Sequence, residues 1–147
     1  MGHPAIMALM RASDRIAHEQ GFVRAFIQRN RQDRCLFLLE HPTRRRDFTK
    51  ELAHFKWLEE RYSQPVSSSR ANSAHGMISL LHQKGASATV WIISEDPKID
   101  ATELPLGEAM EEAWGSSMGT ILSCVPGRLA FFHGEEMKSE RLLERTD

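Results

Sequence analysis

Basic side chains concentrate at the start of one predicted helix. Arg44, Arg45 and Arg46 follow Pro42 and Thr43 in the sequence. Proline does not continue a helix and threonine is a good N-cap, so this pattern predicts that a helix begins here. A helix N-terminus already carries about half a positive charge, which makes cations unfavourable there. Three arginines against that preference indicate an acidic partner, and the free amides of the first turn also attract phosphate.

The same predicted helix, residues 43–62, carries a basic stripe. Five apolar residues recur at helical spacing and predict its buried face: Phe48, Leu52, Phe55, Leu58 and Tyr62. At ~100° per residue, the opposite side holds Arg46, Lys50, Trp57 and Arg61. Cations that neutralise phosphates, beside an indole that can stack on a base, are typical of nucleic-acid binding. The alternative is a solvated face whose cations pair with neighbouring acids, with the indole packed on another helix. The predicted anion-binding residues are Arg44, Arg45, Arg46, Lys50, Trp57 and Arg61.

A second constellation is acidic. Glu95, Asp96 and Asp100 follow the apolar run of residues 89–93, which is the clearest predicted strand. Ligands of α/β units bind beyond the carboxyl ends of strands, and clustered carboxylates there could hold Mg²⁺ for phosphoryl chemistry. The alternative is an acidic turn that uses Asp96-Pro97 as turn former. The second interpretation is favoured because the spacing matches no specific metal motif, and we expect no cofactor.

Other reactive residue types show no enzymatic pattern. His75 and His82 are seven positions apart on a predicted helix, hence about 10 Å apart, which is too far to share one ion. Cys35 and Cys124 lie in apolar runs without a CxxC partner, so buried thiols in a reducing compartment are expected. Binding or regulation is therefore favoured over catalysis.

The elements that position these residues begin with a helical half. Residues 6–27 predict one or two amphipathic helices with a weak point at Gly21. Four arginines lie around the end of this segment: Arg24, Arg29, Arg31 and Arg34. Residues 35–39 are predicted as a short helix in preference to a buried strand. After the helix 43–62, residues 63–73 form the linker-like stretch, either a surface loop or a flap.

The second half alternates strands and helices. Ser73 or Asn72 is expected to cap a helix that ends at Gly85. The elements predicted after it are a strand at 89–93, a helix at 104–114, and strands at 121–125 and 129–132 joined by a Pro126-Gly127 turn. A strand, helix and strand in succession predict a parallel crossover. The tail 139–145 is expected to be a last helix or an edge strand.

These elements predict an α+β fold, with a helical N-terminal half packed on a small mixed three-stranded sheet (βαβ plus hairpin) from the C-terminal half. A chain of 147 residues fits a single domain over 1–147. Its basic helical half is 1–66 and its acidic α/β half is 71–147, with the loop 63–73 between them.

The two halves differ in charge. Residues 1–70 hold thirteen Lys/Arg against eight Asp/Glu, a net of +5, whereas residues 71–147 hold six against twelve, a net of −6. The formal total of −1 favours neutralisation within the fold or across an oligomer interface over a polyanion facing the basic half.

The function predicted from these patterns is an anion-binding or regulatory module that contacts RNA, DNA or a phosphorylated small ligand through the basic helix. The alternatives are a metal-dependent phosphoesterase or nuclease that uses the acidic cluster, and a factor that only pairs with itself or with an acidic protein. No apolar run approaches the ~20 residues needed to cross a bilayer. No secretory signal is recognised, so a soluble cytoplasmic protein without a membrane partner is expected.

Overall fold

The computed structural model describes residues 4–66, 73–114, 116–136 and 139–146, and for residues 4–13 it describes the main chain. Within these residues the strands form one six-stranded sheet in the order β1-β6-β5-β4-β2-β3. Every neighbouring pair is antiparallel. The strands are β1 (Ser63–Pro65), β2 (Thr89–Ser94), β3 (Thr102–Pro105), β4 (Thr120–Val125), β5 (Leu129–His133) and β6 (Arg141–Glu144).

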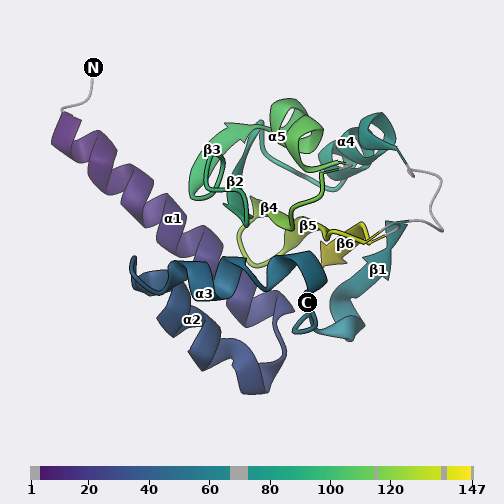
Figure 1. Cartoon of the computed structure of the whole chain (residues 1–147). Helices are drawn as coiled ribbons and strands as arrows, with labels where there is room; N and C mark the ends of the chain where they lie inside the picture. Colours follow the sequence, from purple (N-terminus) through teal and green to yellow (C-terminus); the bar gives the residue numbers. More distant parts are fainter. Residues whose placement is uncertain (1–3, 67–72, 115, 137–138, 147) are drawn as a thin grey trace.

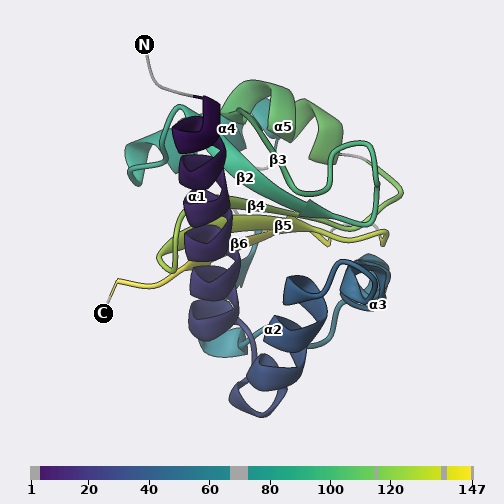
Figure 2. The same ribbon diagram turned by 90° about the vertical axis from the view of Figure 1, so that its left-hand side faces the viewer.

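Helices cover both faces of the sheet (Figures 1 and 2). The α-helices are α1 (Pro4–Phe26), α2 (Gln32–Glu40), α3 (Arg45–Thr49), α4 (Ala74–Gln83) and α5 (Leu106–Ala113). Three short 3₁₀ turns join them: η1 (Arg29–Arg31), η2 (Leu52–His54) and η3 (Glu60–Tyr62). Helices α1, α2 and α3 lie on one side, and α4 and α5 on the other, so the molecule has three layers.

Two apolar cores result, one on each face. In β2, Trp91 and Ile93 are buried against α1 to α3, whereas Val90 and Ile92 are buried against α4 and α5. Successive side chains of a strand point to opposite faces, so a strand covered on both faces must be apolar at every position. This explains the uninterrupted run that marked residues 89–93 as a strand.

Several predicted elements are confirmed. The segment of residues 35–39 lies in α2 and is helical. The hydroxyl of Ser73 caps α4 by accepting a hydrogen bond from the amide of Gly76 at 2.9 Å. The turn at Pro126-Gly127 joins β4 to β5, and Gly127 has the positive φ of 71° that the predicted turn requires. The α+β class is likewise confirmed.

The predicted sheet was too small and its crossover was wrong. Strands β2 and β4 are antiparallel neighbours, not a parallel pair. The cause is β3, which pairs antiparallel with β2 and reverses the chain before α5 begins. The sequence of residues 102–105 is Thr-Glu-Leu-Pro, in which Leu104 is the single large aliphatic residue. This segment therefore shows no pattern that predicts a strand.

The predicted helix 43–62 was also wrong. Helix α3 ends at Thr49, and the chain then continues through η2 into an extended stretch. Leu58 forms a β-bridge with Ile27, and the carbonyl of Trp57 accepts a hydrogen bond from the amide of Gln28 at 2.8 Å. These backbone bonds to the end of α1 replace helical ones. The apolar spacing still reported burial correctly, because Phe48 and Leu52 are fully buried.

Three smaller outcomes concern the ends of elements. Helix α1 continues through Gly21 without a break. The start of the predicted loop 63–73 forms β1, which is an edge strand, and residues 67–72 lie outside the described part. The tail forms β6, which lies between β5 and β1 and is therefore an interior strand. Among the described residues, no helix combines the length and apolarity required to span a bilayer.

Candidate anion-binding site

The predicted basic stripe does not form on one helix. Arg46 belongs to α3 and Lys50 to its C-cap, whereas Arg61 lies in η3, beyond the extended stretch. Trp57 lies in that stretch and is half-buried, with the Arg31 guanidinium 5.3 Å from its ring centroid. Four of the six predicted residues therefore lie at α3 or its caps, whereas Trp57 and Arg61 lie on later segments.

Arg45 is the innermost of them. It donates two hydrogen bonds to Asp100, from Nε to Oδ2 at 2.7 Å and from Nη2 to Oδ1 at 3.0 Å. Its Nη2 also lies 2.7 Å from Oε2 of Glu19, a buried carboxylate that accepts a hydrogen bond from the indole of Trp91. Burial acts to lower the pKa of Arg45, but the hydrogen bonds and charges of the two carboxylates outweigh it and raise that pKa. The guanidinium is thus occupied within the fold.

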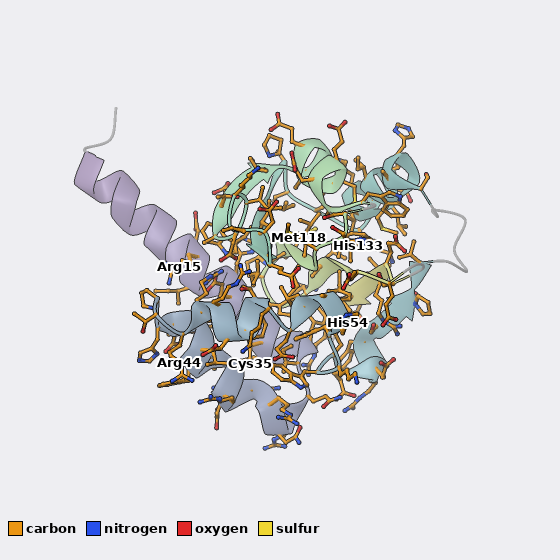
Figure 3. All side chains as sticks on the ribbon, viewed as in Figure 1. Arg15, Cys35, Arg44, His54, Met118 and His133 are labelled. Carbon is orange, nitrogen blue, oxygen red and sulfur yellow. The ribbon has the colours of Figure 1, made fainter. Side chains whose placement is uncertain are left out.

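The neighbouring cations have their own partners. Arg44, which lies beside α2 and α3 (Figure 3), donates a hydrogen bond from Nε to Asp47 at 2.8 Å. That hydrogen bond lowers the pKa of Asp47. Arg46 donates to the carbonyl of Glu95 at 2.8 Å, and Lys50 lies 3.5 Å from Asp47. Arg44, Arg46 and Lys50 thus each have a partner within the fold.

The acidic constellation is a turn. Asp100 accepts hydrogen bonds from Arg45 and from the amide of Ser94, and Asp96 accepts one from the amide of Lys98 at 3.0 Å. In the part of the chain that the structure describes, no group of three or more His, Cys, Asp or Glu residues is placed to hold a metal ion.

Four arginines from distant segments converge elsewhere, around an open pocket of about 330 Å³ that we call the arginine pocket. Arg24 comes from the last turn of α1, Arg29 from η1, Arg61 from η3, and Arg145 from the residue after β6. Tyr62 forms part of the wall. The bridge between Ile27 and Leu58 and the hydrogen bond from Glu59 N to Phe26 O hold η3 beside the end of α1.

The arginine pocket has a surplus of positive charge. Among the described residues of the lining, Glu59 is the carboxylate, and its Oε1 lies 4.0 Å from Nε of Arg61, at the limit of an ion pair. Arg24 pairs at 3.3 Å with Asp33, whose side chain is 95% exposed, so water screens that attraction. Arg29 is exposed and has no ion pair with any described residue. The described part of the lining therefore contains more cations than carboxylates.

Tyr62 positions two of these cations. The guanidinium of Arg145 lies 4.6 Å from the centroid of the Tyr62 ring, and that of Arg61 lies 5.3 Å from it. Arg145 also donates to the carbonyl of Ala25 at 3.4 Å. Cation–π contacts restrain a guanidinium without neutralising its charge. Both side chains are thus held beside the pocket by their contacts with the Tyr62 ring.

Arg61 is the one predicted anion-binding residue that lines the arginine pocket. The sequence already showed a cluster of cations at the end of a predicted helical segment: Arg24, Arg29, Arg31 and Arg34. No sequence signal connects Arg145 to that cluster, because it lies more than a hundred positions away and is brought there by β6.

A serine–histidine pair is a second feature that the sequence did not reveal. Nδ1 of His18 and Oγ of Ser123 are 2.7 Å apart. Burial, the largest effect, lowers the pKa of His18, although the charges of nearby carboxylates act to raise it. Ser123 is only 1% exposed and lies in the middle of β4. Such a hydroxyl has no access to a substrate, so the pair is a packing contact rather than a nucleophile.

No protein-family model, curated protein or solved structure matches this chain.

Proposed function

We propose that the protein is a binding module for phosphate-bearing ligands and that the arginine pocket is its binding site. The observation that carries this proposal is the convergence of four guanidinium groups from four separate segments on one pocket, with a single carboxylate among the described residues of its lining. Like charges repel, so a fold gathers several cations at one place at a cost that an anionic ligand offsets.

Guanidinium groups suit phosphate in particular. Each is planar, remains charged at any physiological pH, and presents its N–H donors in a fork that matches two phosphate oxygens. The pocket is open along one side rather than enclosed, so it can admit one phosphate group of a longer chain as well as a small ligand. RNA, DNA and phosphorylated small molecules therefore share the chemistry that the pocket recognises.

The pocket takes the place of the basic helix as the proposed point of contact. Arg45 is committed to Asp100 and Glu19, so we assign it no part in binding. Arg44, Arg46 and Lys50 lie outside the pocket lining, and any contribution from them would come from their long-range field.

The test is a charge reversal inside the pocket against an equal reversal outside it. Arg29→Glu and Arg61→Glu change two pocket cations that the fold does not bury. Lys98→Glu is the matched control, because Lys98 is exposed and lies in the β2–β3 turn. Fluorescence anisotropy with labelled single-stranded RNA and DNA would measure the affinity of each variant over a range of salt concentrations.

We expect each pocket variant to weaken binding roughly tenfold or more, about 1.4 kcal/mol. Each should also reduce the magnitude of the slope of log K against log salt by about one, the change expected for the loss of one phosphate contact. Lys98→Glu should leave that slope unchanged. Competition by inorganic phosphate or tripolyphosphate would show whether a small anion occupies the same site. Equal losses in the pocket and control variants would contradict the proposal, as would wild-type protein that binds none of these ligands.

A further inference from the structure

Helix α1 extends well beyond the body of the molecule. It has 23 residues, hence a length of about 34 Å. Figure 1 shows its C-terminal half beside α2, while the N-terminal half projects away from the other elements. Residues 4–13, in that projecting half, include seven apolar residues and one charged residue, Arg11. A projecting helical segment of this composition is typical of a protein contact.

An apolar groove begins where the projecting half ends. It lies between α1 and α2 and has a volume of about 350 Å³. Ile16, Leu36 and Leu39 form its apolar wall. Ile16 is 53% exposed, the most exposed of the large apolar side chains in the described residues. Phe37 of α2 is also 41% exposed. The apolar residues of the groove thus follow directly on the apolar segment of residues 4–13.

Among the described residues, the rim of the groove carries one carboxylate that has no cation as its partner. Arg15 lies 3.9 Å from Glu19, which is itself paired with Arg45. Glu40 instead accepts a hydrogen bond from Gln20 at 3.3 Å and forms no ion pair with a described residue. The segment that would fill the groove should therefore be apolar with a single cation. Residues 4–13 have that composition.

We propose that the protein forms a homodimer in which the projecting half of α1 of each copy lies in the α1–α2 groove of the other. Antiparallel packing of two α1 helices about a twofold axis places each N-terminal half beside the C-terminal half of its partner, so one operation fills both grooves. Such an interface is self-complementary, which a twofold dimer requires. Arg11 of one copy would then meet Glu40 of the other. This inference is independent of the arginine pocket and of its ligand.

Sedimentation analysis of the full chain at several protein concentrations tests the dimer. Ile16→Glu places a carboxylate in both symmetric grooves and is expected to weaken dimerisation roughly a hundredfold or more. Met118→Glu is the matched control: Met118 is 38% exposed, lies far from Arg15 and the groove (Figure 3), and should leave the dimer intact. A monomeric wild type, or a dimer equally stable in Ile16→Glu, would overturn the proposal.

A charge exchange identifies the occupant. Arg11→Glu and Glu40→Arg should each weaken the dimer by roughly three- to tenfold, since each opposes like charges. The double variant should recover the wild-type dissociation constant, because it restores the pair with its signs exchanged. Circular dichroism of every variant would check that the fold is retained. Failure of the double variant to recover would show that residues 4–13 of a second copy do not fill the groove.

Discussion

At the scale of single residues, burial separates side chains that the sequence presents as equivalent. Arg44, Arg45 and Arg46 are successive and chemically identical, yet the Arg45 side chain is only 11% exposed and binds two carboxylates. Arg44 is 44% exposed and pairs with a neighbour on the surface. Taking a charge out of water is costly unless partners surround it, so Arg45, Glu19 and Asp100 depend on one another.

The first stability prediction concerns Arg45. Arg45→Ala would leave Glu19 and Asp100 near each other without their shared cation and should lower the free energy of unfolding by about 3–5 kcal/mol. Arg44→Ala removes an exposed ion pair and should cost less than about 1 kcal/mol. Urea denaturation of both variants measures the difference. Similar small losses in the two would mean that the buried network contributes little to stability.

That prediction also changes how the arginine cluster should be tested. Reversing all three charges together would not be a clean test of anion binding. With Arg45 inside the fold, a glutamate at that position would face two carboxylates. Loss of binding in the triple variant would then report unfolding, so Arg44 and Arg46 have to be reversed separately from Arg45.

The tryptophans also differ by environment. Trp91 is 7% exposed and donates a hydrogen bond to Glu19, whereas Trp57 is half-buried. Trp91 is therefore a core residue, and Trp57 is partly exposed. Trp57 owes its position to an extended stretch, however, and not to the outer side of a helix.

At the scale of elements, two helical glycines show that propensity and packing can oppose each other. Gly21 lies where α1 passes the β4–β5 turn, and an added Cβ would come within 2.9 Å of the amide nitrogen of Gly127. Gly107 lies in α5, and an added Cβ would meet nothing within 4 Å. The sequence marked Gly21 as a weak point of the helix, but the residue is there because α1 approaches the turn closely.

The second stability prediction compares these glycines. Alanine is favoured over glycine in a helix by up to about 1 kcal/mol. Gly107→Ala should therefore stabilise the protein by a fraction of that amount, since it lies near the helix start. Gly21→Ala should destabilise it by roughly 1–3 kcal/mol, because α1 or the turn must move. Thermal unfolding of the two variants gives opposite shifts if close packing outweighs propensity at Gly21, and shifts of the same sign would contradict this account.

At the scale of the whole molecule, the sheet joins the two halves of the chain. Strand β1, from the basic half, pairs with β6 from the acidic half, and both faces of the sheet carry a core. Some charge is neutralised between the halves, as in the pairs Arg45–Asp100 and Arg141–Glu60. The surplus of cations remains at the arginine pocket. A single domain over 1–147 stays a prediction.

The third stability prediction tests that single domain. Trp91 reports on the core beneath α1 to α3, and Trp114, stacked on Phe131 with ring centroids 5.9 Å apart, reports on the core beneath α4 and α5. Two variants are compared, each of which retains one of these tryptophans. In each variant, the midpoint of urea unfolding measured by tryptophan fluorescence should equal the midpoint measured by far-ultraviolet circular dichroism. A fluorescence midpoint distinct from the dichroism midpoint in either variant would indicate that the two layers unfold separately.

The sequence by itself determined those features whose cause lies within a few neighbouring residues. The cap of α4 by Ser73, the Pro126-Gly127 turn and the strand at 89–93 each follow from local side-chain chemistry or from periodicity. The tertiary structure alone decided features that depend on distant partners. Bonds to the end of α1 replace a helix after Thr49, the reversal at β3 makes the sheet antiparallel, and β6 brings Arg145 to Arg24, Arg29 and Arg61. Long-range backbone pairing outweighs local propensity at these positions, because an isolated turn of helix gains little free energy. A buried strand or bridge, in contrast, satisfies the hydrogen bonds of its backbone and packs its side chains into a core.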